Sequence, residues 1–276
     1  MIKEIAIVRQ RNKQLITTHD VVAIEEPLEI QLEIGPANQR TITPLAVTMR
    51  TPGNDTELAV GFLFTEGIIS SAKDFAEPVS RSLGENKILI RLGEDFEANL
   101  DKLKRNFYTS SSCGVCGKES IEAIHQVCKV ANAVEHFQID LKMISELPEK
   151  LGKVQEAFVR TGGIHAAALF SSAGDCIDFK EDVGRHNALD KLIGAALLTN
   201  GDESFRLEKA ILLLSGRASF ELIQKAAMAG IQVVCAIGAP SSLAIETAQS
   251  FGITLIGFLK QQSCNVYCGS DRIKNN

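Results

Sequence analysis

The chain has 276 residues, enough for one large domain or two smaller ones, and its hydrophobic content of 45% is that of a globular protein. Its formal charge of −5 and its aromatic content of 5%, with no Trp, argue against a nucleic-acid-binding protein, because such proteins are basic or carry aromatic stacking surfaces. The sequence has no apolar run of 18 residues and no long apolar start, and it has seven cysteines, so we expect a cytoplasmic protein with reduced thiols and no membrane partner.

The first half of the chain is predicted to be rich in β-strands. Residues 28–34 alternate apolar and polar side chains without a break, which is typical of a half-buried strand. Residues 51–55 predict a turn in which Asp55 caps a short helix that ends near Gly67. The expected elements are strands at 5–8, 20–24, 28–34, 45–49 and 87–92, and a helix at 57–65.

The second half is predicted to alternate helices and strands. Helices are expected at 118–130 and 141–160, with a break or new start at Pro148, and an amphipathic helix at 184–198. A hairpin should join 166–170 to 176–180. The tail then reads as strand, helix, strand, helix, strand, which predicts a parallel sheet with right-handed crossovers. Its segments are 210–215, 220–229, 231–237, 241–250 and 253–258.

A pair of cysteines, Cys113 and Cys116, lies in a Ser/Gly-rich stretch before the helix expected from Lys118. The positive end of that helix and the Lys118 ammonium would favour the thiolate form of a nearby cysteine. This predicts reactive sulfur, and sulfur carriage as a persulfide is the leading hypothesis. A dithiol redox pair and two inert cysteines are the alternatives.

A structural zinc site is a further alternative for the cysteine pair. Such a site needs four ligands, and Cys264 and Cys268 could supply the other two, although their spacing is less regular. A zinc deaminase is disfavoured, because its His-x-Glu motif precedes the Cys-x-x-Cys pair. In this chain the pair precedes His165, and Ala167 stands where the Glu would be.

Two strand-to-helix turns in the tail predict a binding site for an anion. Ser215-Gly216-Arg217 follows one predicted strand, and residues 238–242, which include Ser241, follow the next. Open α/β sheets bind ligands at the carboxyl ends of their strands, where helix N–H groups are free to meet a phosphate. Arg217 could add a bidentate contact. Ordinary capping of the two helices by serine is the alternative.

A third polar segment, residues 181–187, opens the helix expected at 184–198. Its acidic residues suit a helix start, but Arg185, His186 and Asn187 together before an apolar stripe favour a functional role over a capping network. For His165, a hydrogen-bonded structural role and a role in ligand binding or proton transfer are both open.

Five blocks of this sequence resemble the FdhD family, the formate dehydrogenase accessory sulfurtransferases, and the resemblance covers nearly the whole chain. The blocks occur in the family's order, and their joint occurrence is highly specific. They are residues 111–118, 161–165, 181–187, 215–217 and 239–244.

The resemblance implies a fold class and two regions. It implies an α/β protein with a three-layer, cytidine-deaminase-like α/β/α domain and a smaller β-rich N-terminal region. The division is expected at 1–108 and 109–276, with the cysteine pair in the second part. A homodimer is also implied.

The resemblance further implies a persulfide sulfurtransferase. Sulfur would pass from a cysteine desulfurase to the molybdenum bis(molybdopterin guanine dinucleotide) cofactor before that cofactor enters formate dehydrogenase. Cys113 would carry the persulfide and Cys116 would support it. The cofactor would be bound as a substrate, with no permanently bound group and no protein-bound metal. The alternative function is a cofactor-binding chaperone whose cysteines only dock a partner or bind zinc.

The cofactor contacts combine the family's C-terminal segment with the polar turns. The resemblance places that segment directly after the last predicted strand, where the family's expected Arg is absent and Lys260 is the only cation. The expected cofactor-binding residues are Phe258, Leu259, Lys260, Gln261, Gln262, Ser263, Ser215, Gly216, Arg217, Ser241, Arg185 and His186.

Overall fold

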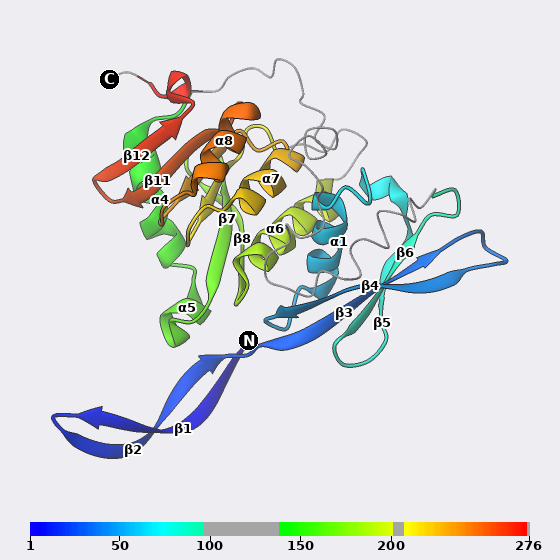
Figure 1. Ribbon diagram of the computed structural model, residues 1–276, viewed down its shortest axis with the longest axis horizontal. Coiled ribbons are helices and arrows are strands. Elements are labelled where there is room, and N and C mark those ends of the chain that lie inside the picture. Colours follow the sequence, from blue (N-terminus) through cyan, green and yellow to red (C-terminus); the bar gives the residue numbers. More distant parts are fainter. Residues whose placement is uncertain (97–137, 201–206, 275–276) are drawn as a thin grey trace.

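The computed structural model describes residues 1–96, 138–200 and 207–274, and within them the strands form three sheets of two, four and six strands (Figure 1). The predicted helix at 118–130 and the cysteine pair lie outside the described residues. In the described ranges, no helix is both long and apolar enough to cross a membrane.

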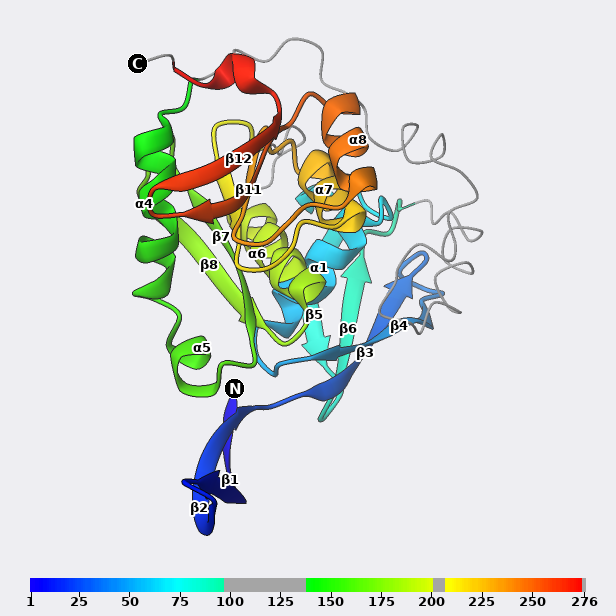
Figure 2. The ribbon, with the colours of Figure 1, turned by 60° about the vertical axis from the view of Figure 1, so that its left-hand side comes forward.

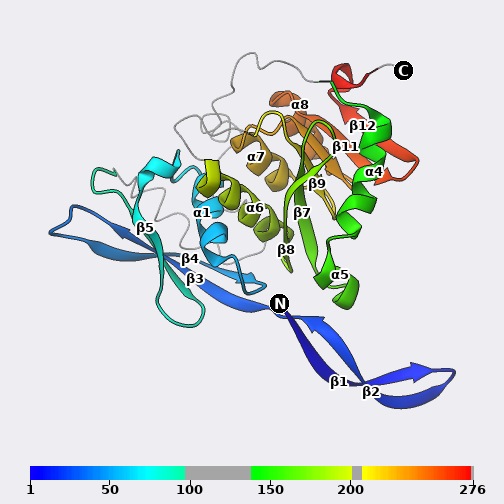
Figure 3. The same ribbon diagram turned by 180° about the vertical axis from the view of Figure 1, so that it is seen from behind.

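The two-stranded sheet is a hairpin at the N-terminus. β1 (Ile2–Arg11) pairs with β2 (Gln14–Ala23) over ten rungs, and the turn residues Asn12 and Lys13 have positive φ angles, as a tight two-residue hairpin requires. The Ile24 amide donates to the Met1 carbonyl and closes the base of the hairpin. We call residues 1–24 the N-terminal arm; it projects from the body of the protein in all three views (Figures 1, 2 and 3).

The four-stranded sheet has the order β4-β3-β6-β5 and packs against one helix. The alternation predicted at 28–34 is confirmed, because Leu28, Ile30, Leu32 and Ile34 are buried and the residues between them are less so. One strand, β5, was not predicted, since only part of it is buried and its sequence does not alternate clearly. The elements are β3 (Glu26–Ile34), β4 (Thr41–Arg50), α1 (Asp55–Thr65), the short η1 (Ala72–Asp74), β5 (Phe75–Ser82) and β6 (Lys87–Leu92).

The six-stranded sheet has the order β12-β11-β10-β9-β7-β8. β9, β10 and β11 are parallel, which confirms the predicted sheet of the tail, and β7 and β8 form the predicted antiparallel hairpin. The antiparallel edge strand β12 was not predicted. The strands are β7 (His165–Phe170), β8 (Cys176–Asp182), β9 (Ile211–Leu214), β10 (Val233–Ala236), β11 (Thr254–Lys260) and β12 (Ser263–Cys268).

Helices cover both faces of the six-stranded sheet (Figure 2). Alternate residues of β7, β9 and β10 enter two hydrophobic clusters, one under α6, α7 and α8 and the other under α4. The protein is therefore a mixed α/β fold with three layers at this sheet; its likeness to cytidine deaminases stays a prediction. The helices are α4 (Leu141–Gly152), α5 (Glu156–Thr161), α6 (Arg185–Asn200), α7 (Phe220–Met228), α8 (Ser242–Ser250) and the short η2 (Ser270–Arg272).

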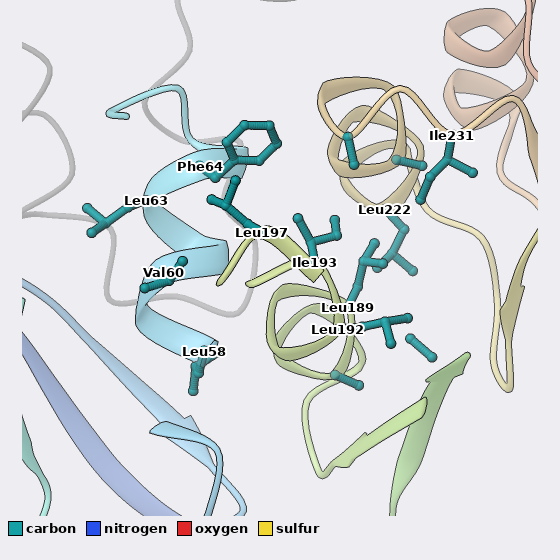
Figure 4. Packing of buried hydrophobic residues seen from close by; sticks show 14 of the residues in the cluster. Leu58, Val60, Leu63, Phe64, Leu189, Leu192, Ile193, Leu197, Leu222 and Ile231 are labelled. Carbon is teal, nitrogen blue, oxygen red and sulfur yellow. The ribbon is translucent and has the colours of Figure 1, made fainter. Parts of the chain in front are cut away.

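The larger hydrophobic cluster extends from the four-stranded sheet to the six-stranded sheet through α1 and α6 (Figure 4). The two helices cross at close range, because a Cβ added at Gly61 would lie 1.8 Å from the Asp190 carbonyl oxygen, and one at Gly194 would lie 1.9 Å from the Glu57 carbonyl oxygen. The predicted boundary between residues 108 and 109 lies outside the described residues and stays a prediction.

Two local predictions were wrong. The N-cap of α1 is Asn54, and the Asp55 carboxylate instead accepts two hydrogen bonds of 2.9 Å from the Arg50 guanidinium. Pro148 lies inside α4 and does not break it, and the helices separate at residues 153–155. The apolar face of α4 buries Ile144, Leu147 and Leu151, and this packing offsets the backbone hydrogen bond that a proline forfeits.

Candidate functional site

Several polar segments predicted to be functional meet at one edge of the six-stranded sheet. β9, β10 and β11 end there, and because β7 runs antiparallel to β9, β7 begins there and β8 ends there. We call this region the strand-end edge. It comprises residues 165, 182–187, 215–221, 238–241 and 257–258.

Backbone hydrogen bonds join the two predicted turns directly. The Gly238 amide donates to the Gly216 carbonyl at 2.9 Å, and the Ser241 amide donates to the Ala218 carbonyl at 3.0 Å. The next strand is attached in the same way, since the Phe258 amide donates to the Gly238 carbonyl at 3.1 Å. The turns after β9 and β10 and the end of β11 therefore lie side by side, as the parallel-sheet prediction required.

Glycine at position 238 is what permits this close approach. A Cβ there would lie 3.0 Å from the backbone nitrogen and Cα of Arg217, closer than packed side chains normally come. Gly216 in turn lies beside the imidazole of His165, where an added Cβ would be 3.2 Å from Nδ1. His165 thus belongs to the same edge as the two turns.

The two predicted serines are engaged in local structure. The Ser241 hydroxyl accepts from the Ala244 amide at 3.2 Å and caps α8, and the Ser215 hydroxyl accepts from the Ala166 amide at 2.8 Å. The capping interpretation therefore holds for Ser241. Free donors for a ligand at these turns come from the first backbone amides of α7 and α8 and from Arg217, whose side chain is exposed.

The start of α6 adds a polar cluster to the edge. His186 Nε2 lies 2.9 Å from a carboxylate oxygen of Glu221 and 3.3 Å from the Ser219 hydroxyl. The Nε of Arg185 is buried and has no hydrogen-bond partner among the described residues. Glu221 was missed in the sequence, because a Glu in the first turn of a helix reads as an ordinary partner of the helix dipole.

Electrostatics at the edge keep Glu221 ionised and His165 neutral. Burial alone would raise the pKa of Glu221, but the hydrogen bond and charge of His186 bring it below its ordinary value. Burial lowers the pKa of His165, and the neighbouring charge of Arg185 lowers it further. The cations Arg185 and Arg217 stand at the starts of α6 and α7, a combination that suits an anionic ligand. Lys260 ends β11 and is exposed, next to the tip of the β11–β12 hairpin.

The predicted C-terminal contact segment is divided by the fold. Phe258 has a φ of 51°, is 44% exposed and belongs to the strand-end edge, whereas Leu259 is 1% exposed and packs in the cluster under α4. Gln261 lies at the tip of the β11–β12 hairpin, and its amide donates to Glu149 of α4. Gln262 and Ser263 are exposed at the same tip.

Cys113 and Cys116 lie outside the described residues. Cys264 and Cys268 pack against different hydrophobic clusters on opposite faces of the sheet, because a bulge interrupts the register between β11 and β12. Burial raises the pKa of both thiols. Within the part of the chain that the structure describes, no group of three His, Cys, Asp or Glu side chains could hold a metal ion.

Two buried ion pairs anchor the strand-end edge. Lys191 Nζ lies 2.7 Å from the carboxylate of Asp182 and 2.7 Å from the Thr51 carbonyl, and that carboxylate also accepts from the Thr51 amide. Asp190, which precedes Lys191 on α6, forms the second pair, with its carboxylate 2.9 Å from Lys225 Nζ. These buried charges on α6 correct its prediction as an amphipathic helix, because most of its surface is enclosed.

The fold and this edge define a mixed α/β protein whose candidate ligand site lies at the carboxyl ends of parallel strands. The chain belongs to the FdhD/NarQ family, whose model matches residues 23–274. It is 44% identical to the sulfur carrier protein FdhD of Streptomyces coelicolor over 275 residues, covering 97% of this chain and 94% of the relative. It is also 44% identical to the sulfur carrier protein FdhD of Picrophilus torridus over 272 residues, covering 97% of each chain.

A solved structure supports the fold. The crystal structure of a formate dehydrogenase accessory protein from Desulfotalea psychrophila superposes with a TM-score of 0.73 at 22% identity and covers 99% of both chains. At this level of identity the similarity concerns the fold alone.

Proposed function

We propose that this chain is a persulfide sulfur carrier that serves formate dehydrogenase. Sulfur would come from a cysteine desulfurase and pass to the molybdenum bis(molybdopterin guanine dinucleotide) cofactor, bound as a substrate, before the cofactor enters the dehydrogenase. The observation that carries the proposal is end-to-end similarity to relatives named as sulfur carriers, in a chain that keeps a Cys-x-x-Cys pair.

The cysteine pair supplies balanced chemistry for both transfers. The Cys113 thiolate attacks the outer sulfur of the donor's persulfide, the donor's S–S bond breaks, and the donor leaves as a thiolate. Cys113 then carries the persulfide. Attack by the Cys116 thiolate on the inner sulfur of that persulfide forms a Cys113–Cys116 disulfide and releases hydrosulfide toward the cofactor. A dithiol reductant restores the pair for the next cycle.

The strand-end edge would hold the phosphates of the cofactor. The amides that begin α7 and α8 would donate to phosphate oxygens, and Arg217 and Lys260 would add positive charge. The unpartnered Nε of Arg185 fits an anionic ligand, because a phosphate oxygen would give that buried donor a partner.

Mass spectrometry tests the sulfur step. The protein is incubated with a cysteine desulfurase and cysteine, and its intact mass should rise by one sulfur atom. The Cys113→Ala variant should lose this adduct. The control variant Cys176→Ala should keep it, because it removes an exposed cysteine of β8 that has no role in the proposed transfer. An unmodified wild-type mass would contradict the proposal.

Calorimetric titration with guanosine diphosphate tests the ligand site. Arg217→Ala should weaken binding by about tenfold, the effect of losing one charged hydrogen bond of ~1.5 kcal/mol. The matched control, Lys142→Ala, removes an exposed cation from α4 and should leave the affinity unchanged. Equal affinities of wild type and Arg217→Ala for guanosine diphosphate would show that this turn does not bind the phosphates.

The second candidate function is a cofactor-binding chaperone without sulfur chemistry. It is favoured by the strand-end edge, which forms from residues far from the cysteine pair in the sequence. Complementation in cells separates the two functions. A chaperone whose cysteines only dock a partner would still mature formate dehydrogenase after Cys113→Ala, whereas a sulfur carrier would not.

A further inference from the structure

The two helices that begin at the strand-end edge have the same backbone start but different side-chain caps. Ser219 precedes α7 with φ −93° and ψ 164°, and Ser241 precedes α8 with φ −84° and ψ 162°. A parallel bridge between Ala218 and Pro240 holds the preceding residues side by side. The Ser241 hydroxyl caps α8 by accepting from the Ala244 amide, whereas no side-chain hydrogen bond caps α7. Backbone geometry therefore does not explain why α7 is uncapped.

The hydroxyl of Ser219 is engaged by His186 instead. Its oxygen lies 3.3 Å from His186 Nε2, and the same nitrogen lies 2.9 Å from a carboxylate oxygen of Glu221. Because an ionised carboxylate only accepts hydrogen bonds, Nε2 carries the proton and donates it to Glu221, and the Ser219 oxygen can accept from the same N–H. One imidazole N–H on α6 thus holds two side chains at the start of α7.

The pairing with His186 also keeps Glu221 away from other positive groups. Glu221 lies in the first turn of α7, where a free carboxylate would be attracted to the helix N-terminus. The charge of Arg185 acts on Glu221, and yet the Nε of Arg185 is buried without a hydrogen-bond partner. Lys225, a further cation near Glu221, is paired with Asp190. Both Arg185 and the start of α7 are therefore left for a ligand.

A purely structural role is a weaker explanation of the His186–Glu221 pair. The helices α6 and α7 are already joined by the buried pair of Asp190 with Lys225 and by the larger hydrophobic cluster. The side chains of His186 and Glu221 are 20% and 16% exposed, and they lie at the strand-end edge. A partly exposed ion pair adds little stability, so its position beside the candidate ligand site is the more informative property.

We propose that His186 is a positioning residue for the anionic ligand of the strand-end edge. Its Nε2–H holds Glu221 and Ser219, so that neither the carboxylate nor the hydroxyl takes the place of a phosphate oxygen at the start of α7. The same hydrogen bond prevents Glu221 from pairing with Arg185. His186 acts through these neighbours and does not need to touch the ligand. The inference rests on the proposed function, in which this edge holds the phosphates of the cofactor.

Calorimetric titration of the full chain with guanosine diphosphate tests the role of His186. His186→Ala should weaken binding by about tenfold or more, because Glu221 is then free to occupy the start of α7 and to pair with Arg185. Adding Glu221→Gln should restore the affinity to within about threefold of wild type, since a neutral amide competes far less for a cation. The matched control is Glu246→Gln, which removes an exposed carboxylate of α8 and should not restore binding to His186→Ala.

The effect of Glu221→Gln should also depend on His186. In the wild-type background the carboxylate is already held, so its removal should strengthen binding less than it does in the His186→Ala background. Equal gains in the two backgrounds would overturn the proposal. An unchanged affinity of His186→Ala would overturn it too, while leaving the ligand site in place. A wild-type protein that does not bind guanosine diphosphate would overturn both the ligand site and this inference.

Amide hydrogen exchange, measured by NMR without ligand, tests the same role independently. Without His186, the Ser219 hydroxyl should cap α7 in the way that Ser241 caps α8. The amide of Leu222, the third residue of α7, corresponds to that of Ala244 and should exchange more slowly in His186→Ala than in wild type. A merely structural role predicts faster exchange, because the start of α7 would loosen. Unchanged or faster exchange of this amide would overturn the role assigned to His186.

Discussion

At the scale of single residues, the strand-end edge depends on which groups stay charged. His165 is held neutral by burial and by Arg185, while Glu221 is held ionised by His186. The site therefore offers a neutral imidazole next to the cations Arg185 and Arg217. The carboxylates at this edge are engaged, Glu221 with His186 and Asp182 with Lys191. An anion entering the edge meets positive charge with little competition from carboxylates.

His165 gives the protein a predictable dependence of stability on pH. Because the pKa of His165 is lowered in the folded state, the unfolded chain binds a proton near pH 6.5 while the folded chain does not. Stability should therefore fall as the pH falls below about 6.5, until the folded-state pKa is reached. Urea unfolding at pH 7.5 and 5.5 should show a smaller loss for His165→Gln than for wild type.

The matched control for this slope is His19→Gln, since His19 is exposed on the arm. It should retain the wild-type difference between the two pH values. If His165→Gln leaves the pH dependence of stability unchanged, His165 is protonated as easily in the folded protein as in the unfolded chain. If His19→Gln reduces that dependence equally, the effect is not specific to His165.

The role of a residue was predictable from the sequence only where the residues it acts with lie next to it in the sequence. Ser215, Gly216 and Arg217 were found because a strand, a turn and a helix follow one another there. Glu221 was missed because its partner, His186, is distant in sequence. Leu259 was grouped with its exposed neighbours, and its burial became visible only from the bulge in the β11–β12 pairing.

At the scale of elements, the crossing of α1 and α6 depends on two glycines. The backbone carbonyl of Asp190 occupies the space of a Cβ at position 61, and the carbonyl of Glu57 occupies that of a Cβ at position 194. Gly61→Ala or Gly194→Ala would push the helices apart and should lower the free energy of unfolding by about 3 kcal/mol or more. Urea denaturation measures the change.

Gly152→Ala is the control for the helix pair. Gly152 ends α4, and an added Cβ there would meet nothing within 4 Å. Alanine favours a helix over glycine by up to about 1 kcal/mol, so this variant should be as stable as wild type or slightly more stable. Equal losses at positions 61 and 152 would show that helix propensity, and not close packing, determines the result.

Most elements were predictable because their periodicity is strong. β3 alternates, and the β-α-β-α-β order of the tail predicts the parallel strands β9, β10 and β11. The predictions of a helix break and of a helix cap failed because tertiary contacts outweigh the local preferences of those residues. Pro148 is tolerated inside α4 because that helix packs on the sheet, and Asp55 binds the buried Arg50 guanidinium instead of capping α1.

At the scale of the whole molecule, hydrogen bonds from buried ion pairs of the C-terminal half reach Thr51 and Thr65 of the N-terminal half. Lys225 of α7 contacts Asp190 of α6 at 2.9 Å and the Thr65 hydroxyl of α1 at 2.8 Å. Burial alone would lower the pKa of Lys225, but the charges of Asp190 and Glu66 raise it, so the lysine stays charged. The larger hydrophobic cluster spans the same helices, and we therefore expect the halves to unfold together.

Removing one partner of this pair tests that coupling. Lys225→Met should cost about 3–5 kcal/mol, because it leaves the Asp190 carboxylate buried without its cation, whereas Lys225→Met with Asp190→Leu should recover much of the loss. Lys142→Met, on the exposed side of α4, should change stability little. Hydrogen exchange should report lost protection in β3 and β10 together in Lys225→Met. Exchange that rises in only one of these strands would show instead that the two sheets are separate folding units joined by a local contact.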